Sequence, residues 1–260
     1  MRFATFNILN GRSPADDRVD ADRFARAVKA LDADVLGLQE VDRNQPRSAN
    51  TDLTEVAAEA MGAAEHRFVA ALSGSPGATW IAATGEEQPD SAAYGIALLS
   101  RYPVHSWEVI RLPPVPVRVP MRFRGSLRPV LVRDEPRVAV AAVLDTPHGP
   151  MTVVNTHLSF IRWWNRRQLR VLMRGLEAAP APLVLMGDLN TEPPAASQIT
   201  GMRPLVSAPT FPAEAAREQI DHILAGDTVT WVGPGRTHRF DLSDHLALSV
   251  DLSVDLDGPA

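Results

Sequence analysis

The chain has 260 residues, of which 45% are hydrophobic and 22% charged, a balance that indicates a globular α/β protein and excludes a disordered or collagen-like one. It contains no cysteine, which excludes disulfides, thiolate metal sites and a cysteine nucleophile, and its net charge is −5. Because no apolar run reaches about 18 residues and no signal-peptide pattern opens the chain, we expect no stable membrane insertion and a cytoplasmic location.

Short apolar runs without polar alternation predict buried strands in eight places. These are Arg2–Ile8, Asp34–Gln39, Gly95–Ser100, Val138–Leu144, Met151–Asn155, Leu183–Gly187, Ile220–Leu224 and Leu246–Leu252. Apolar residues at helical spacing predict helices over Asp20–Leu31, Asp52–Met61 and Ile161–Leu176. Strands alternating with helices indicate an α/β fold, and we predict one domain over residues 1–254 with a C-terminal tail at 255–260.

Two segments between these elements are predicted to be loops. The stretch Leu112–Pro120 is rich in proline, which suits neither a central strand nor a helix interior, so we expect an extended surface loop. A Gly/Ser/Pro cluster predicts a second loop over Ser73–Gly77.

The region around the first loop is strongly basic. Residues 111–137 hold seven arginines and two acidic residues, a charge of +5, so the rest of the chain carries −10. Two interpretations stay open. Either this segment faces a polyanionic substrate, with Arg118, Arg122 and Arg124 deciding the substrate class, or it is a solvated surface excursion.

Polar and ionisable residues follow or adjoin six of the apolar runs. They are Asn7, Gln39-Glu40, Asn155-Thr156-His157, Asp188-Leu189-Asn190, Asp221-His222 and Ser243-Asp244-His245. Taken singly, each fits a turn or a helix cap. Because sites in α/β proteins form at strand ends, six such endings predict that these side chains converge on one rim.

The motifs at these positions resemble those of the endonuclease/exonuclease/phosphatase superfamily, which has the fold of pancreatic deoxyribonuclease. They are TFNI (5–8), LQEV (38–41), YGIALLSRYPV (94–104), NTHL (155–158), GDLN (187–190), QIDHIL (219–224) and SDHLAL (243–248), in the order of the family. The resemblance implies a four-layer sandwich of two packed mixed β-sheets flanked by helices. It also implies divalent-metal-dependent hydrolysis of phosphate esters.

The resemblance implies a metal side of the site. Phosphoester hydrolysis needs a hard cation, and Mg²⁺ takes oxygen ligands. We expect Mg²⁺, or Mn²⁺, at Glu40 with Asn7 and Asp244, and no organic cofactor. Some relatives carry an acidic residue two positions after the first Asn, where this chain has Leu9, so metal binding would depend more on Glu40 and Asp244.

The resemblance also implies a catalytic set. It assigns the catalytic histidine to His245, oriented by Asp221, and a second histidine that contacts the phosphate or aids the leaving group to His157. Asp188 would align or activate the attacking water, and Asn190 would hydrogen-bond the phosphoryl oxygens. His222 is expected to pack or cap, and the number of metal ions, one or two, stays open.

Four further residues are candidates for substrate contacts. Arg137 matches a family arginine near the site, and the Tyr94 hydroxyl either reaches the site or packs at a strand end. Trp163 and Trp164 are adjacent and cannot share one helical face. Trp163 with Arg166 would therefore either contact a ring and a phosphate of the substrate, or belong to a helix start with solvated arginines.

The sequence leaves the substrate class open. The basic segment and the tryptophan pair favour a phosphodiesterase or nuclease, whereas the acidic remainder favours a small-molecule, inositol or lipid phosphate ester. A function of another class is a catalytically inactive phosphate-binding module, which the intact set of candidate residues disfavours. The expected partner is a phosphate-ester substrate, with nucleic acid as one candidate, and we expect a monomer.

Overall fold

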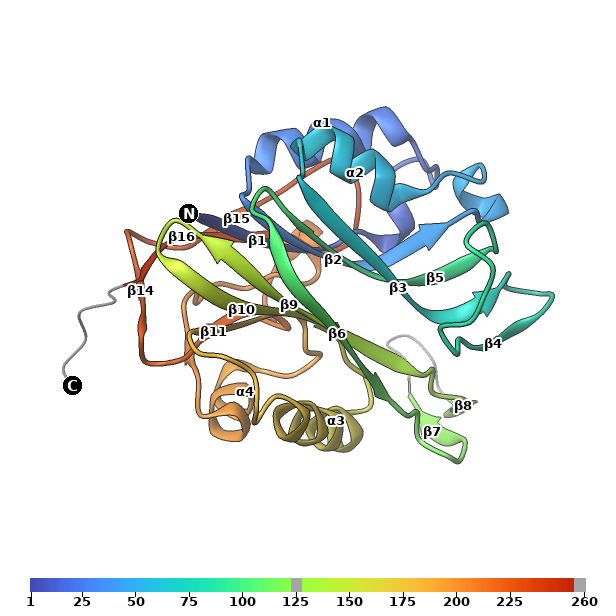
Figure 1. Ribbon diagram of the computed structural model, residues 1–260. Coiled ribbons are helices and arrows are strands. Elements are labelled where there is room, and N and C mark those ends of the chain that lie inside the picture. Colours follow the sequence, from blue (N-terminus) through green and yellow to red (C-terminus); the bar gives the residue numbers. More distant parts are fainter. Residues whose placement is uncertain (123–127, 255–260) are drawn as a thin grey trace.

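Two mixed β-sheets lie face to face, and helices cover the outer face of each, which makes four layers (Figure 1). The computed structural model describes residues 1–122 and 128–254. Arg124 and the predicted tail, 255–260, lie outside the described residues. The predicted four-layer α/β sandwich is confirmed. No helix in the described ranges is long and apolar enough to cross a membrane.

The first sheet is built around the parallel pair β1 and β2, with antiparallel strands on either side. Its order is β14-β16-β1-β2-β5-β3-β4, with β15 paired to β16. The bounds are β1 Arg2–Asn7, β2 Val35–Arg43, β3 Glu65–Gly74, β4 Trp80–Ala82, β5 Ala93–Ser100, β14 Val229–Trp231, β15 Arg236–His238 and β16 Ala247–Val254.

The second sheet is built around the parallel pair β10 and β11. Its order is β12-β13-β11-β10-β9-β6, and a separate two-stranded arm pairs β7 with β8. The bounds are β6 Val104–Leu112, β7 Val119–Met121, β8 Val130–Val132, β9 Arg137–Thr146, β10 Gly149–His157, β11 Leu183–Asp188, β12 Arg203–Pro204 and β13 Asp221–Ala225.

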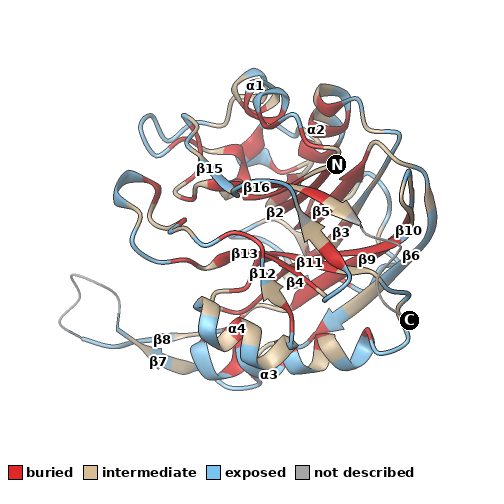
Figure 2. Ribbon diagram, turned by 90° about the vertical axis from the view of Figure 1, so that its left-hand side faces the viewer, coloured by how far each residue is buried: buried red, intermediate tan, exposed pale blue. Residues whose placement is uncertain are grey.

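The helices form the two outer layers, and three apolar clusters hold the four layers together. They are α1 Ala21–Leu31, α2 Leu53–Met61, α3 Arg162–Gly175 and α4 Pro193–Thr200, with 3₁₀ turns at Leu9–Gly11, Pro46–Ser48 and Ala213–Ala215. One cluster lies between the sheets, a second under α1 and α2, and a third under α3 and α4. Figure 2 shows the buried strands in the centre and the exposed residues on the outer faces of the helices.

The helix starts follow from capping chemistry. The side chain of Asp20 accepts a hydrogen bond from the backbone N–H of Arg23 at 2.9 Å, and Asp52 accepts one from Thr54 at 2.9 Å. Each carboxylate satisfies an N–H that the first helical turn leaves unpaired. The apolar stripe of α1, which includes Phe24, Val28 and Leu31, is then buried against the first sheet.

A buried polar bridge joins the two sheets directly behind the strand ends. The amide of Asn155 on β10 donates to the backbone carbonyls of Leu38 and Ala97 in the first sheet, at 2.9 and 2.8 Å. Its oxygen accepts from the side chain of Gln39 at 2.7 Å. A Cβ on Gly37 would lie 2.9 Å from the Asn155 amide, so only glycine admits this bridge.

All eight predicted strands and three predicted helices are present, with small shifts at their ends. The predicted loop at Ser73–Gly77 is wrong for its first two residues, which belong to β3, and Leu112 at the start of the proline-rich loop ends β6. That loop also runs into β7, because Pro120 lies in a two-stranded arm where a missing N–H is tolerated.

Candidate active site

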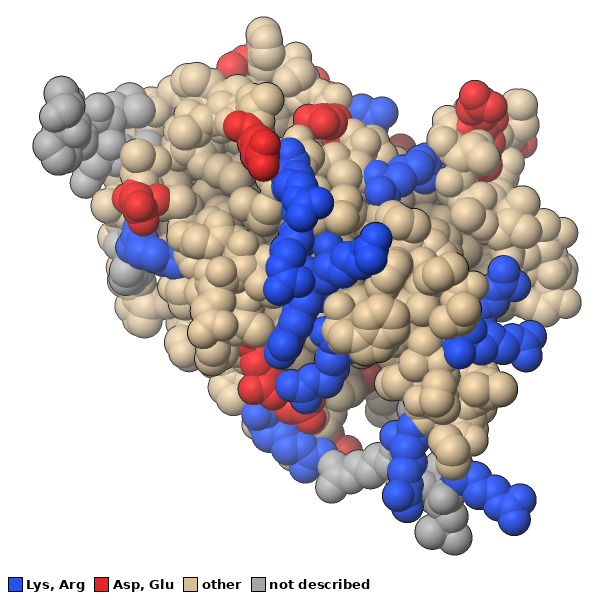
Figure 3. Space-filling model, turned by 90° about the horizontal axis from the view of Figure 1, so that it is seen from below, with Lys and Arg blue, Asp and Glu red and all other residues tan. Residues whose placement is uncertain are grey.

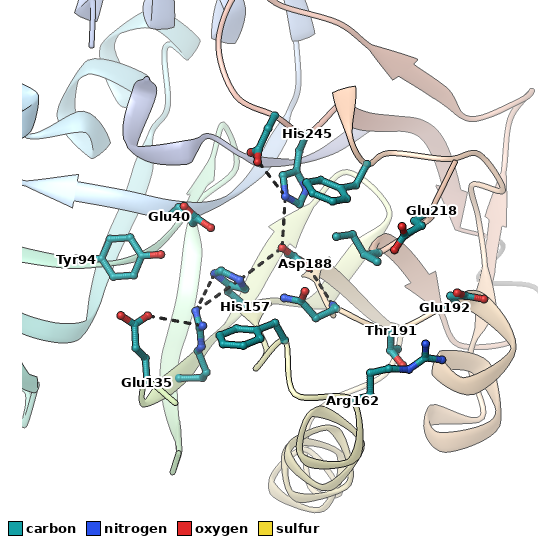
Figure 4. A pocket seen from close by; sticks show the side chains of 16 residues that line it. Glu40, Tyr94, Glu135, His157, Arg162, Asp188, Thr191, Glu192, Glu218 and His245 are labelled. Carbon is teal, nitrogen blue, oxygen red and sulfur yellow. Dashed lines mark hydrogen bonds and ion pairs between the residues drawn. The ribbon is translucent and has the colours of Figure 1, made fainter. Parts of the chain in front are cut away.

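The predicted site residues gather at one end of the sandwich, around a cavity of about 570 Å³ (Figure 4). Register explains part of this convergence. His157 on β10 pairs with Asp188 on β11 in parallel, and Asp188 pairs with Asp221 on β13 in antiparallel, so three functional side chains stand in one row. The cavity is lined by Glu40, Tyr94, Glu135, Arg137, His157, Phe160, Arg162, Asp188, Asn190, Thr191, Glu192, Phe211, Glu218, Ile220, Asp244 and His245.

Unusual backbone conformations aim several of these side chains. Glu40 has a φ of 55° and lies in a β-bulge between Gln39 and Val41 that breaks the pairing of β2 with β5. Asn190 and Ser243 have φ values of 47° and 65°. Left-handed conformations are costly for residues other than glycine, and they cluster where a site has to be shaped. The bulge turns the Glu40 carboxylate toward the cavity.

His245 and Asp221 form a buried pair. The Nδ1 of His245 lies 2.9 Å from an Asp221 carboxylate oxygen. Burial alone would lower the pKa of His245, but the charge and hydrogen bond of Asp221, together with Asp188 and Asp244, raise this pKa to about 10. His245 is therefore an imidazolium at neutral pH, and its ring packs against Phe211 with centroids 4.9 Å apart.

Asp188 lies between the two histidines. One carboxylate oxygen accepts a hydrogen bond from Asn7 at 3.0 Å and lies 3.5 Å from the Nε2 of His157 and 4.0 Å from that of His245. Burial and the charge of Asp221 raise the pKa of Asp188 to about 7, against the opposing effect of His245. A carboxylate with a pKa near neutrality is suited to accept a proton in catalysis.

His157 contrasts with His245 in charge. The Nη1 of Arg137 lies 3.2 Å from the Nδ1 of His157 and 3.5 Å from its Nε2. Because a guanidinium can only donate, we assign the acceptor role to the nearer Nδ1 and the histidine proton to Nε2. Burial, Arg137 and His245 hold the pKa of His157 well below its usual value. His157 is therefore a neutral donor that faces Asp188.

Asn190 is held from three sides. Its backbone N–H donates to the second oxygen of Asp188 at 2.9 Å, and its side-chain amide donates to the carbonyl of Leu158 at 3.0 Å. The side chain of Asn165, a buried residue of α3, donates to the carbonyl of Asn190 at 2.5 Å. Asn190 also lines the cavity, and the second N–H of its amide could donate to a phosphoryl oxygen there.

The candidate metal residues lie on the side of the cavity that the first sheet forms. The Glu40 carboxylate accepts one hydrogen bond, from Asn7 at 3.2 Å, and no ion pair reaches it from the described residues. Burial raises the pKa of Glu40, and the carboxylate of Asp244 adds to that increase. Asn7 presents its NH2 group to Glu40, while its amide oxygen accepts from the backbone N–H of Leu9 at 3.2 Å, so Asn7 would bind a cation only through that oxygen. A buried carboxylate without an ion-pair partner, near a second carboxylate, has the donor chemistry that Mg²⁺ prefers.

A second group of ligand atoms lies nearby. Asp188, Asp221 and His245 bring ligand atoms within 4.8 Å of one another and could also hold an ion. Because a protonated imidazole offers no lone pair, His245 ligates only if it loses the proton that Asp221 stabilises. The donor set at Glu40 therefore fits a hard cation better.

Tyr94 and the residues outside the strand-end motifs complete the lining. Tyr94 is 8% exposed and lines the cavity, and burial raises its pKa well above 10, so its hydroxyl is a neutral donor. The prediction missed Glu135, Phe160 and Phe211, which come from segments without a recognisable pattern. His222, expected to pack or cap, is fully buried and lies 2.7 Å from the carbonyl of Thr191.

Two predicted substrate contacts lie outside the cavity. Trp163 is 56% exposed and Arg166 is exposed, both on α3, whereas the cavity is lined by Phe160 and Arg162 from the start of that helix. Trp164, by contrast, is buried, although the two rings meet edge to face with centroids 5.3 Å apart. The roles of Trp163 and Arg166 toward a substrate stay predictions.

Comparisons with known proteins agree with this geometry. Among solved structures, an endonuclease/exonuclease/phosphatase from Beutenbergia cavernae is 25% identical with a TM-score of 0.75, over 100% of this chain and 73% of that one. A protein of the same description from Bacteroides vulgatus is 21% identical, with a TM-score of 0.67 over 98% of each chain. A mannosyl-6-phosphatase from Bacteroides thetaiotaomicron is 15% identical, with a TM-score of 0.66 over 97% of this chain and 99% of that one, and these last two share the fold.

No curated protein matches the sequence. The model of the Endonuclease/Exonuclease/phosphatase family matches residues 4–245, nearly the whole chain. The chain therefore belongs to the endonuclease/exonuclease/phosphatase family, a family of hydrolases that act on phosphate esters.

Proposed function

We propose that this protein is a divalent-metal-dependent phosphodiesterase, with nucleic acid as one candidate substrate. The observation that carries the proposal is the position of Asp188 between the charged His245 and the neutral His157. Asp188 itself has a pKa of about 7. Groups with pKa values moved apart by their surroundings are typical of acid–base catalysis.

A cation would be held by Glu40, Asn7 and Asp244. Mg²⁺, or Mn²⁺, supplies Lewis-acid neutralisation of the charge that develops on the phosphate. The residues of the chain itself do the remaining work. Asn190 and His157 line the cavity, where the amide N–H of Asn190 and the Nε2–H of His157 would donate to phosphoryl oxygens and orient the phosphorus toward the attacking water.

Proton transfer is assigned to Asp188 and His245. Ionised Asp188 accepts a proton from the water as its oxygen attacks phosphorus. His245, kept protonated by Asp221, lies on the side of Asp188 away from His157. Its positive charge stabilises the negative charge of the transition state. The phosphorus–oxygen bond to the leaving group breaks in line, and the departing oxygen takes a proton from the imidazolium of His245. Asp188, which has accepted the proton of the water, returns a proton to His245 and is ionised again.

A small phosphate ester is a second candidate substrate. The outer lining of the cavity carries Glu192 and Glu218 in addition to Asp244, against one exposed cation, Arg162, while Glu135 lies 3.7 Å from the buried Arg137 (Figure 4). Such a rim repels a long polyanion, whereas it can hydrogen-bond a hydroxyl-rich leaving group.

The test is hydrolysis of a panel with and without chelator. It contains an aryl phosphodiester, an aryl phosphomonoester, single- and double-stranded DNA, RNA, inositol phosphates, mannose 6-phosphate and sphingomyelin. We expect chelator-sensitive turnover that Glu40→Ala and His245→Ala both abolish. Turnover that resists chelation, or full activity in both variants, would overturn the mechanism. Metal binding without turnover of any substrate would favour a phosphate-binding module.

A further inference from the structure

A row of arginines runs along the exposed side of α3. Arg162, Arg166, Arg170 and Arg174 recur every four residues, and all four are exposed. At 1.5 Å per residue the row is about 18 Å long. In Figure 3, which looks onto α3 from below, a column of basic side chains crosses the centre of the face.

The positive charges of this row lower the stability of α3. Like charges four residues apart on a helix repel one another, and opposite charges at the same spacing would stabilise the helix. Within the described residues, no ion pair joins a carboxylate to any of these four side chains; Arg170 donates to the carbonyl of Arg166 instead. An unneutralised row with no structural role for its charge indicates an anionic partner.

Exposed apolar side chains lie beside the row, on the β7–β8 arm (residues 114–121 and 128–133). Six large hydrophobic residues are exposed in the described part of the chain, and four of them belong to the arm or to the start of α3. These four are Val117, Val130, Leu131 and Trp163, which are 62%, 50%, 61% and 56% exposed. The arm also carries the exposed cations Arg118 and Arg133.

The arm and α3 form one surface because they are packed together. Val115, Ile161 and Trp164 make a small apolar cluster, against which Val119 and Met121 of the arm also pack. The indole N–H of Trp164 donates to the carbonyl of Pro113 at 2.9 Å. Figures 1 and 2 both place the arm beside α3, and Figure 2 shows it projecting from the body of the molecule.

From this combination we propose that α3 and the β7–β8 arm dock the protein reversibly onto the surface of an anionic lipid bilayer. The arginine row supplies attraction to phosphate headgroups, while Trp163 and the aliphatic side chains of the arm enter the boundary between headgroups and acyl chains. This mode requires no membrane-spanning helix, because the apolar side of α3 stays in the protein core.

A bilayer fits this surface better than a nucleic acid does. Phosphodiester backbones are bound by cations, hydroxyls and amides, and bases stack on aromatic rings. Val117, Val130 and Leu131 have no partner of that kind on a nucleic acid, whereas all three can be desolvated by lipid. Tryptophan is also a preferred residue at the membrane–water boundary.

The docked orientation would bring the active-site cavity to the bilayer. Phe160 and Arg162 line the cavity and directly precede Trp163, so the docking surface and the cavity mouth are continuous along the chain. The proposal goes beyond the proposed hydrolysis and does not depend on which phosphate ester is cleaved.

The experiment measures co-sedimentation of the full chain, treated with chelator, with vesicles of phosphatidylcholine alone or of phosphatidylcholine mixed with phosphatidylserine. We expect binding to the anionic vesicles only. Arg170→Glu/Arg174→Glu should weaken this binding by well over tenfold, because each basic residue near an anionic surface contributes about fivefold in affinity. The matched control, Arg26→Glu/Lys29→Glu, reverses two exposed charges on α1 in the opposite helix layer and should bind as the wild type does.

A third variant tests the apolar part of the surface. Leu131→Ser should bind anionic vesicles at low salt but detach at salt concentrations that the wild type withstands, because lipid burial is not screened. Equal sedimentation with both kinds of vesicle, no sedimentation with either, or equal loss in the α1 control would overturn the proposal. So would a single-stranded oligonucleotide that binds with the same dependence on Arg170 and Arg174 while vesicles do not. Hydrolysis is not read out, so a failure here leaves the proposed function standing.

Discussion

The two sheets contribute different chemistry to the same cavity. From the first sheet and its loops come Asn7, Glu40 and Asp244, of which Asn7 donates a hydrogen bond to Glu40. The second sheet contributes His157, Asp188 and Asp221, which stand in one row across three paired strands and influence one another's protonation. In the proposed mechanism the first half of the site, Asn7, Glu40 and Asp244, binds the cation, whereas the second half, His157, Asp188 and Asp221, carries the proton chemistry. Changes in the two halves should therefore respond differently to metal concentration.

The largest loss is expected from Asp188→Asn, in the proton-transfer half. The amide keeps the size of the side chain but cannot accept a proton, so kcat should fall on the order of 10³-fold. Because the proposed cation ligands are Glu40, Asn7 and Asp244 rather than Asp188, additional Mg²⁺ should restore little of the rate. Steady-state kinetics across a Mg²⁺ titration measure this, with the exposed Asp227→Asn as control. Recovery to the wild-type rate at high Mg²⁺ would show that Asp188 belongs to the metal half instead.

Glu40→Gln, a change in the metal half, should lower kcat on the order of 10²-fold at limiting Mg²⁺. The rate should partly recover as the Mg²⁺ concentration rises. The same substitution should not lower the thermal stability of the metal-free protein. Because burial raises the pKa of Glu40, its ionised form destabilises the fold at any pH above that pKa, so the metal-free variant should melt no lower than the wild type.

Calorimetry with and without Mg²⁺ separates these two effects. A bound ion stabilises the wild type by about 2.7 kcal/mol at one hundred times its Kd, and Glu40→Gln should lose most of that increase. The exposed Glu65→Gln serves as the control. A wild-type melting temperature that does not respond to Mg²⁺ would remove the metal assignment.

Asp221→Asn should move the pH profile rather than abolish activity. For the wild type, the pKa of Asp188 near 7 and that of His245 near 10 predict a rate that rises near pH 7 and falls near pH 10. The Asp221 charge raises both pKa values, so its removal should move both limbs to lower pH and reduce the rate at pH 8 roughly tenfold. Profiles of kcat/KM test this. An unchanged alkaline limb would mean that His245 does not limit the rate.

The sequence predicted the strands that are buried on both faces but missed others for physical reasons. Continuous apolar runs identify β1, β2, β5, β10 and β11. Strand β3 begins with the exposed and half-buried residues Glu65–Phe68, and β6 is an edge strand with mixed burial, so neither makes such a run. Helix α4 begins with two prolines, which suit its first turn but are more often found in loops.

The sequence predicted which residues form the candidate site but not which of them contact one another. Asn7 and Asp188 are 181 residues apart in sequence, and only the packing of the two sheets makes them hydrogen-bond partners. The left-handed conformation of Glu40 depends on a bulge that pairing with β5 creates. Phe211, which packs on His245, comes from a loop whose sequence carries no periodic signal.

The smallest effect on catalysis is expected from Asn155→Ala, which cuts the bridge between the two halves without touching the cavity. The change leaves the carbonyls of Leu38 and Ala97 without the donor that Asn155 supplies, at a cost of about 3 kcal/mol. Thermal unfolding should then occur roughly 10 °C lower, while kcat at a permissive temperature changes less than tenfold. The control is Gln88→Ala, which removes an exposed amide. If kcat instead fell as far as in Asp188→Asn at an unchanged melting temperature, the bridge would be setting the distance between Glu40 and His157, and the two halves would not act independently.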